Sequence, residues 1–480
     1  MRTLALDVGT SLVKAVLFDP AGRPTRVART AVPVLRPAPG RAEQDMTKVW
    51  DAVVSSVRDL GLGPDEVHLV SVTAQGDGCW LVDAAGDPAG PAILWSDGRA
   101  QDLVTAWVDE GRLQHGRSRN GLLLFPGSPA AILAWLRHHQ PERLAASATA
   151  TSCSGFVTGR LVGRARIELS DASHPFADLA AGAYDPELVE LLDAHGSRHL
   201  LPEIVRTVDS LLPITVAAAD ALGLAPGTPV VQAPYDVPAS AIGAGCTDPG
   251  ASFAILGTAL ICGTVLEAGA PLDRASTVIA LGMDGLLLEF HPTLTGVGAL
   301  GWAAELMGLA DAAEVVELAS TTSPGARGAL ALPYLSPAGE RAPFLDPHAP
   351  GGLLGLNFDT GRAEVARALV EALSLVVREC LESGPQRGDL HVCGGGSNSD
   401  FWCGMLADAT ARAVLRPDAS ESGARGAMIC ARVAVGEFTQ LADAATALAV
   451  PHEAFEPDSD AAPHFEDLAS RLFSARETLR

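Results

Sequence analysis

Short apolar runs separated by turn residues open the chain and predict the start of an α/β domain. Residues 3–8 and 12–18 are both apolar, and residues 25–33 form a third candidate strand. Gly9-Thr10-Ser11 separates the first two runs, and glycine beside small polar residues is typical of a tight turn. The pattern therefore predicts a β-meander at the head of the chain.

A similar pattern recurs in the second half of the chain. Residues 255–267 read ILGTALICGTVLE, with Gly257-Thr258 between two apolar strands, as Gly9-Thr10 is within DVGTSLVKAVLFD at 7–19. A single match of this kind is weak, because Gly-Thr is common in turns. Its place at the head of each half nevertheless indicates a duplicated fold.

Helical periodicity is clearest at residues 47–60 and 363–383, whereas residues 81–83 and 92–95 resemble a hairpin. The second helix is followed by the strand 390–393, the loop Gly394-Gly395-Gly396-Ser397-Asn398 and a helix from about residue 399. This order is typical of a nucleotide-binding turn, because glycine admits a ligand close to the backbone and a helix start offers free N–H donors. The alternative is a tight turn in which glycine serves only the backbone geometry.

The acidic composition narrows the class of partners. The 480 residues include 34 Lys and Arg against 57 Asp and Glu, for a net charge of −23. Such a surface repels nucleic-acid phosphates and anionic lipids, so we expect a small-molecule partner and neither nucleic acid nor a membrane. The eight cysteines contain no C-x-x-C pair, and the first residues are not those of a signal peptide. These features predict a cytoplasmic protein with reduced cysteines.

Two aspartates at strand ends are candidates for phosphoryl-transfer chemistry. Asp7 ends the first apolar run, where a carboxylate can hold Mg²⁺, and Thr10, Ser11 and Lys14 offer donors to a phosphate. The alternative is an ordinary hairpin turn with a solvated aspartate. Asp236 follows the strand 230–233, where a carboxylate can orient an attacking hydroxyl and take its proton. Taken alone, Asp236 is better explained as a turn or capping residue.

The segment Gln75-Gly76-Asp77-Gly78, followed by Trp80, is a candidate substrate site. A carboxylate can bind two vicinal hydroxyls at once, and tryptophan can pack on carbon-bound hydrogens. The alternative is a β-turn beside a core tryptophan. Two familiar phosphate-binding signatures are absent from the sequence: G-x-x-x-x-G-K-[ST] and the H-R-D and D-F-G pair. Their absence excludes a P-loop protein and a protein-kinase fold.

These pieces, in this order, resemble the FGGY family of carbohydrate kinases. The resemblance runs from the first strand to about residue 436 and is strongest at LPYLSPAGERAPFLDP (332–347) and GGLLGLNFDTGRAEVARALVEAL (351–373). GGGSNSDFW at 394–402 and ESGARGAM at 421–428 add to it, while Leu369 stands where a smaller or β-branched residue is expected. The family implies an α/β fold of two actin-like (ribonuclease H-like) domains with ATP and sugar in the cleft between them. The implied ranges are a sugar-binding domain at 1–243, a nucleotide-binding domain at 250–436 and a helical extension at 437–480.

The resemblance also implies roles for individual residues. Asp7 is similar to the Mg²⁺-associated carboxylate, and Asp236 to the catalytic base, which also contacts the substrate. Gln75, Asp77 and Trp80 take the positions of substrate-binding residues. The expected ATP-binding residues are Thr10, Ser11 and Lys14 in the first phosphate loop, Gly257 and Thr258 in the second, and Gly395, Gly396 and Asn398 in the nucleotide loop. Many relatives continue the second loop with serine or threonine, where this chain has Ala259.

Substrate choice depends on where the chain departs from its relatives. Xylulose kinases commonly have Gln-Met-His-Gly at Gln75–Gly78 and Asp-Asn-Ala at Asp236–Pro238, and glycerol kinases have Arg-Glu at Gly76-Asp77. The Gln-Gly-Asp-Gly-x-Trp-Leu pattern is most similar to erythritol kinases, with L-xylulose or other pentulose kinases as the alternative. A non-catalytic actin-fold sugar sensor is a remote alternative, which the retained Asp7 and Asp236 disfavour. The oligomeric state, including a homodimer, stays open.

Overall fold

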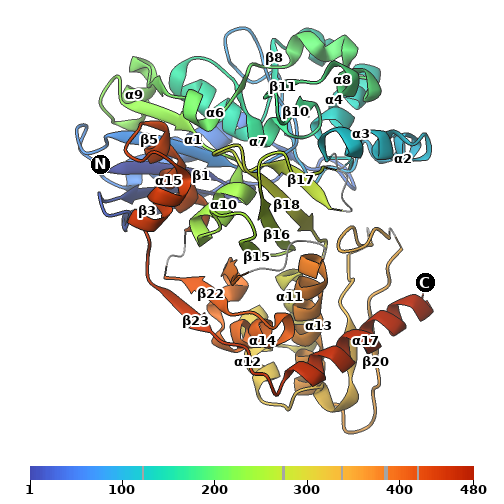
Figure 1. Cartoon of the computed structure of the whole chain (residues 1–480). Helices are drawn as coiled ribbons and strands as arrows, with labels where there is room; N and C mark the ends of the chain where they lie inside the picture. The colour runs from blue at the N-terminus through green and yellow to red at the C-terminus, as the bar shows by residue number, and fades with distance from the viewer. Residues whose placement is uncertain are drawn as a thin grey trace. The chain divides into compact units, whose positions relative to one another are not determined.

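The computed structural model describes residues 1–121, 124–272, 276–336, 339–346, 348–382, 388–418 and 421–479 (Figure 1). The chain forms two compact units. The first unit contains residues 1–243, 267–288 and 421–449, and the second contains 244–266, 289–420 and 450–480. These units differ from the predicted domain ranges of 1–243, 250–436 and 437–480, because the chain returns twice to the first unit.

β1 (Thr3–Val8) lies inside the sheet of the first unit, whose strand order is β13-β14-β5-β1-β2-β3. It pairs antiparallel with β2 (Leu12–Phe18), which pairs antiparallel with β3 (Pro24–Ala31). On its other side β1 is parallel to β5 (Leu69–Ala74), and β5 is parallel to β14 (Pro229–Gln232). The predicted β-meander is confirmed, and it places Asp7 on a fully buried strand.

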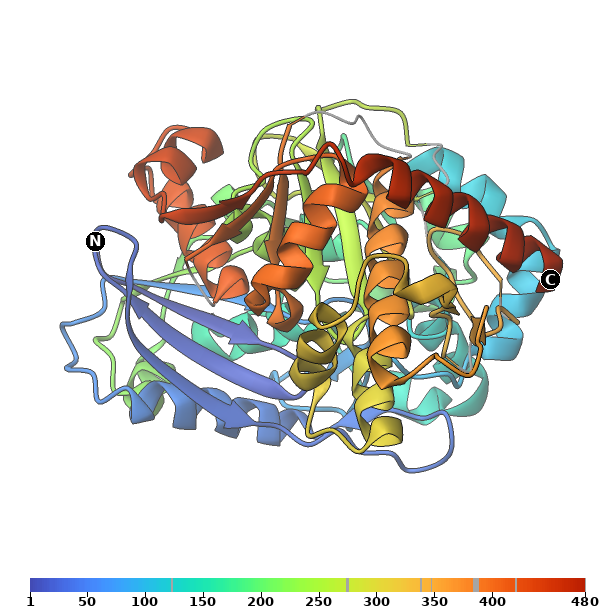
Figure 2. The same cartoon turned by 90° about the horizontal axis from the view of Figure 1, so that it is seen from below.

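Helices cover both faces of this sheet. α1 (Met46–Asp59) begins at the capping residue Asp45 and lies along β1–β3, as the blue helix in Figure 2 shows. Val70 and Val72 of β5 belong to the core that α1 enters, whereas Leu69 packs against α15 (Ser422–Ala434). Successive strand residues point to opposite faces, so α1 and α15 lie on opposite sides of the sheet. A segment from the C-terminal part of the sequence thus completes the core of the first unit.

The predicted hairpin at residues 81–95 is not formed as expected. β6 (Trp80–Val82) pairs with β8 (Thr149–Thr151), and β7 (Ala92–Ile93) pairs with β4 (Glu43–Gln44). Isolated bridges link Cys79 to Ile93 and Val82 to Pro88, and each includes a residue outside the two predicted strands. Each strand finds its main partner far away in the sequence, which a local pattern of turn residues does not reveal.

The second unit repeats the strand arrangement of the first. Its sheet contains the order β16-β15-β21-β22-β23. β15 (Ser252–Leu256) and β16 (Leu260–Leu266) form an antiparallel hairpin, and β15 is parallel to β21 (Leu390–Cys393). The hairpin β1–β2 and its parallel neighbour β5 have the same relation, so the predicted duplication is confirmed. The long helix α13 (Arg362–Glu382) packs against β16 and against α14 (Asp400–Thr410), which follows the glycine loop as predicted.

The remaining elements complete the two units. The other helices are α2 (Gln101–Asp109), α3 (Arg112–Asn120), α4 (Pro129–His139), α5 (Pro141–Ala145), α6 (Cys153–Val162), α7 (Leu169–Ala172), α8 (Pro186–Leu191), α9 (Val216–Leu222), α10 (Asp236–Ala244), α11 (Val297–Met307), α12 (Ala312–Ser320), α16 (Leu441–Ala447) and α17 (Ala462–Leu479). The other strands are β9 (Ile167–Glu168), β10 (Ala177–Asp178), β11 (Ala183–Tyr184), β12 (Ile204–Val205), β13 (Leu212–Pro213), β17 (Thr277–Ala280), β18 (Leu287–Pro292), β19 (Leu330–Leu332), β20 (Gly352–Leu354), β22 (Val414–Pro417) and β23 (His452–Phe455).

Two predictions from composition can be compared with the structure. All eight cysteines are buried and reduced, as expected. Among the helices of the described ranges, none combines the length and the apolar character needed to cross a membrane.

Candidate active site

Asp7 and Lys14 face each other across the first hairpin. They are register partners on β1 and β2, and Lys14 Nζ lies 3.3 Å from Asp7 Oδ2 and 3.1 Å from Glu421 Oε2. Arg29 also contacts Glu421. Burial raises the pKa of Asp7 above its ordinary value, although Lys14 opposes the rise. Lys14 therefore lies between two carboxylates and fixes the orientation of Asp7.

Thr10 is held in a closed network of hydrogen bonds. Its Oγ1 donates to Gln75 Oε1 at 2.9 Å and accepts from Trp95 Nε1 at 3.1 Å. Gln75 Nε2 donates to Gln44 Oε1 at 2.8 Å, and Gln44 Nε2 donates to the Thr10 carbonyl at 2.5 Å. The side-chain amide of Gln75 is thus buried and engaged with the protein through both of its polar atoms. Ser11, beside Thr10, is exposed.

Asp236 is the first residue of α10 and follows the buried segment after β14. Burial raises the pKa of Asp236 well above its ordinary value, and the nearby carboxylates of Asp7, Asp171 and Asp77 raise it further. These side chains come from β1, α7, the loop after β5 and α10. A carboxyl group with a strongly perturbed pKa among charged neighbours is typical of a functional site.

The Gln75–Gly78 segment packs tightly beside Asp236. A Cβ atom added at Gly76 would lie 2.5 Å from Cδ2 of Tyr235, which directly precedes Asp236. Asp77 and Gly78 both have left-handed backbone conformations, with φ of 56° and 73°. The strained conformation of a non-glycine residue at 77 indicates that the surrounding structure determines where the Asp77 backbone lies.

Trp80, a predicted substrate-binding residue, lies in the hydrophobic core of the first unit. Its side chain is completely buried and stacks on Phe156, with ring centroids 5.8 Å apart. This agrees with the alternative that Trp80 is a core tryptophan beside a β-turn. Trp95, in contrast, is 37% exposed and donates a hydrogen bond to Thr10. An available signal was its place at the end of a short strand, before the polar Ser96-Asp97-Gly98-Arg99. Asp171 and Glu421 were also missed. Asp171 belongs to no motif singled out above, and Glu421 opens the ESGARGAM segment at 421–428 but was assigned no role there.

The predicted loops of the second unit lie together at one edge of its sheet. The carbonyls of Gly257 and Thr258 accept hydrogen bonds from the backbone N–H groups of Val297 and Gly298 at the start of α11, at 2.9 and 3.0 Å. The Thr258 side chain stays exposed. A Cβ atom added at Gly394 would lie 2.9 Å from the carbonyl oxygen of Leu256, just before the first loop. The second unit thus brings its two glycine-containing loops side by side.

The nucleotide-type loop has an open face and a supported face. Gly395 and Asn398 are exposed, and no atom of the described ranges would lie within 4 Å of a Cβ atom added at Gly395. At Gly396 the added atom would lie 2.6 Å from the Trp402 ring. Arg416 Nη1 donates to the carbonyl of Ser397 at 2.7 Å and so supports the loop from behind. The open face is where a ligand can approach the backbone.

Comparison with known proteins identifies the family. Residues 2–243 match the N-terminal domain of the FGGY family of carbohydrate kinases, and residues 283–435 match its C-terminal domain. The chain belongs to the FGGY family of carbohydrate kinases. Within this family it is 30% identical to the erythritol kinase of Brucella abortus (strain 2308) over 503 aligned positions, which cover 99% of this chain and 96% of the relative. It is 29% identical to the L-xylulose/3-keto-L-gulonate kinase of Escherichia coli (strain K12), over 95% of this chain and 93% of the relative.

Solved structures agree with this assignment. The FGGY chain matches the xylulose kinase of Rhodospirillum rubrum with a TM-score of 0.89 and 28% identity, covering 100% of this chain and 99% of that one. The glycerol kinase of Plasmodium falciparum with ADP shares the fold, with a TM-score of 0.84 at 16% identity. The prediction of a two-domain α/β carbohydrate kinase is confirmed. FGGY kinases are ATP-dependent and act on small molecules, so the protein is a carbohydrate or polyol kinase.

Proposed function

We propose that this kinase transfers the γ-phosphoryl group of ATP to a hydroxyl of a small polyol, with erythritol as the leading substrate. The main support is the association of Asp7, Asp77 and Asp171 with Asp236, whose pKa is raised by burial and by these neighbours. In their ionised forms these carboxylates accept hydrogen bonds and donate none. Such a group suits a ligand whose oxygens all carry hydrogen, as those of a polyol do. A ketose also presents a carbonyl oxygen, which can only accept.

We assign Asp236 as the catalytic base. Its carboxylate takes the proton of the substrate hydroxyl, whose oxygen forms a bond to the γ-phosphorus. The bond from that phosphorus to the β–γ bridging oxygen breaks, and ADP leaves. Burial followed by the charges of Asp7 and Asp171 raises the pKa of Asp236, which makes it a stronger base than an ordinary aspartate.

Asp7 is the assigned Mg²⁺ carboxylate. Mg²⁺ is commonly held by one or two carboxylates together with substrate phosphates and water, and the oxygens of Asp7 fit that preference. In the ranges that the structure describes, no group of three or more His, Cys, Asp or Glu residues is arranged to hold a metal ion. When bound, Mg²⁺ supplies charge neutralisation at the phosphates. The contribution of the chain is to hold Asp7 in place through Lys14, 3.3 Å away.

ATP binding is assigned to loops in both units. The residues are Thr10, Ser11 and Lys14 in the first unit, and Gly257, Thr258, Gly395, Gly396 and Asn398 in the second. Support comes from the exposed side chains of Ser11, Thr258 and Asn398 and from the open space beside Gly395. Lys14 contacts two carboxylates, so we expect it to serve Asp7 as well as phosphate.

A panel of substrates tests the proposed polyol preference. ADP production is measured with erythritol, glycerol, xylitol, D-xylulose and L-xylulose at saturating ATP and Mg²⁺. We expect kcat/KM for erythritol to exceed that for each ketose by about tenfold or more, as one charge-assisted hydrogen bond allows. Preference for a ketose would instead favour the L-xylulose alternative, which the relative from E. coli supports at 29% identity. ATP hydrolysis without a phosphorylated product would point to a sensor.

A further inference from the structure

A small recess lies beside Asp77 in the first unit. Its volume is about 30 Å³, and its polar lining includes Asp77, Ser152, Asp171 and His174, while Leu133 and Phe176 are among its apolar walls. About 10–15 Å³ of such volume holds one water-sized atom. The recess therefore has room for about two heavy atoms, the size of a hydroxymethyl group.

Asp171 connects the recess to the proposed substrate site. Its side chain is 6% exposed, and its Oδ2 accepts a hydrogen bond from Ser154 Oγ at 2.8 Å. Its carboxylate also accepts hydrogen bonds from Ser152 and from the backbone N–H of Asp77. Burial raises the pKa of Asp171 to about 6, so the group is mostly ionised near neutral pH. It therefore presents an acceptor to the recess.

His174 presents a second acceptor. The residue is 5% exposed, and burial lowers its pKa to about 4, so the imidazole is neutral near pH 7. The ring donates a hydrogen bond to the backbone of Val278, whereas Nε2 has no hydrogen-bond partner within the described part of the chain. Because a neutral imidazole carries one proton, the ring nitrogen bonded to Val278 holds it and Nε2 is an acceptor. Buried acceptors in proteins are nearly always hydrogen-bonded, so we expect a ligand to supply a donor to Nε2.

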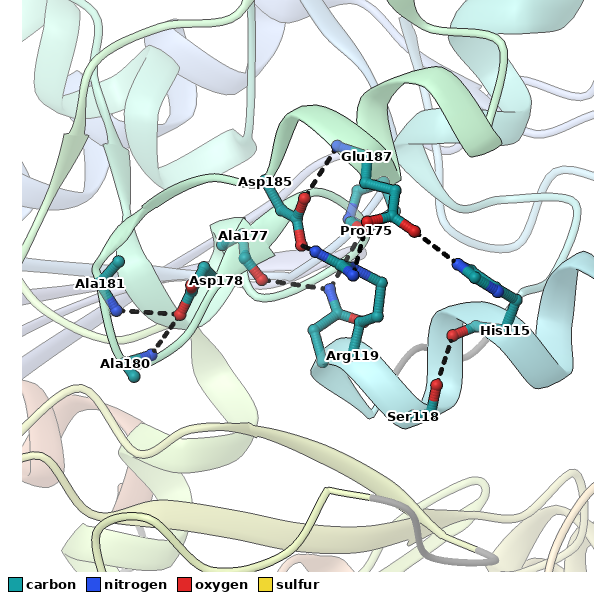
Figure 3. Close-up of polar contacts among 11 residues, drawn as sticks. His115, Ser118, Arg119, Pro175, Ala177, Asp178, Ala180, Ala181, Asp185 and Glu187 are labelled. Atoms are coloured by element: carbon teal, nitrogen blue, oxygen red, sulfur yellow. Dashed lines mark hydrogen bonds and ion pairs between the residues drawn. The ribbon is translucent and has the colours of Figure 1, made fainter.

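The loop that carries His174 is held firmly. Asn120 Nδ2, at the end of α3, donates to the carbonyls of Ser173, Pro175 and Ala177 at 3.0, 3.1 and 3.3 Å. Figure 3 shows the same end of α3 joined to the segment 175–187, where Arg119 contacts Asp185 at 2.6 and 2.8 Å. The recess therefore has a preformed shape, which is what a selective subsite requires.

We propose that this recess binds the hydroxymethyl end of the substrate, the end that is not phosphorylated. The terminal hydroxyl donates to His174 Nε2 or to the Asp171 carboxylate. The inference rests on the proposed function, because it takes Asp77 to lie beside the substrate. A methyl end would leave His174 Nε2 without a donor, and a carboxylate end would be repelled by Asp171 and Asp77. The recess thus selects neutral substrates that end in a primary alcohol.

The test compares erythritol with butane-1,2,3-triol, which lacks one terminal hydroxyl. We expect the wild type to prefer erythritol in kcat/KM by about 10–100-fold, the range for a hydrogen bond to a charged group. Asp171→Asn and His174→Leu should each reduce this preference to about threefold or less, while the KM for ATP changes little. The exposed Asp220, replaced by asparagine, is the matched control and should keep the wild-type ratio.

The outcomes distinguish a failure of the recess inference from a failure of the polyol proposal. Melting curves identify any variant that fails to fold, and the other variant then decides. A wild-type preference that survives both substitutions would overturn the inference. If the wild type accepts ketoses only, the polyol proposal fails. In that case kcat/KM is compared between the best ketose and its analogue that lacks the hydroxyl at the unphosphorylated end. If Asp171→Asn leaves this kcat/KM ratio unchanged, the recess inference is overturned as well.

Discussion

Gly76→Ala is the sharpest test of how the Gln75–Gly78 segment positions Asp236. The added Cβ would lie 2.5 Å from Tyr235 Cδ2 and 2.7 Å from Cε2, whereas ordinary contact begins at 3.4 Å. The ring, or the loop, must therefore move by 3.4 − 2.5 = 0.9 Å. Tyr235 is only 6% exposed and precedes Asp236, so the displacement is passed to the proposed catalytic base.

Both stability and rate should respond to this displacement. Overpacking of a buried site typically costs about 1–3 kcal/mol of unfolding free energy. A displacement of about 1 Å at reacting groups costs about 10²-fold in rate. We therefore expect Gly76→Ala to lower kcat/KM for the polyol by about 10²-fold. The KM for ATP should be nearly unchanged, because the overlap involves none of the proposed nucleotide loops.

Steady-state kinetics beside chemical denaturation measures both effects. Gly63→Ala is the matched control, since its added Cβ would have no atom within 4 Å among the residues that the structure describes. In a Tyr235→Ala background, Gly76→Ala should cost less unfolding free energy than in the wild type, giving a non-additive mutant cycle. If Gly76→Ala matches Gly63→Ala in kcat/KM within about threefold, the segment does not control the position of Asp236.

The remaining predictions concern Asp236, Glu168 and Gly395. Asp236→Asn should lower kcat by about 10²–10⁴-fold without loss of melting temperature. Because burial raises the pKa of Asp236, the wild-type rate should fall on the acid side at a pH above the ordinary 3.8, and an acid limb near 3.8 would contradict this reasoning. Burial raises the pKa of Glu168 from 4.5 to about 7, so its contribution to stability is present below pH 4.5 and lost as the pH rises towards 7. Between pH 4.5 and 7, the unfolding free energy of the wild type should therefore fall by about 3 kcal/mol relative to that of Glu168→Gln. Urea titrations at several pH values measure both free energies, and the same pH dependence in the two proteins would refute the prediction. Gly395→Ala should fold normally but raise the KM for ATP, while Gly404→Ala, whose added Cβ is equally unobstructed, should leave it unchanged. An equal KM for ATP in the two variants would remove Gly395 from the nucleotide site.

Local sequence patterns were sufficient for the elements whose partners lie nearby. The hairpin β1–β2, the turn at Gly9–Ser11 and the strand, glycine loop and helix around Gly394 all follow from apolar periodicity and turn residues within about 20 positions. The ordered motifs also allowed the kinase family to be recognised. Asp7 and Asp236 could be proposed because each stands at the end of a strand or directly after one.

Only the tertiary structure decided which side chains share one environment. Trp80 and Trp95 follow similar local patterns, yet β6 pairs with β8 and carries Trp80 into the core, while Trp95 reaches Thr10. Asp171 and His174 join Asp77 at one recess across nearly a hundred residues of chain, and Glu421 reaches Lys14 from α15. Periodicity reports which face of an element is apolar, because neighbours along the chain determine it. Contacts between distant elements depend on strand pairing and packing, to which a single sequence gives no local signal.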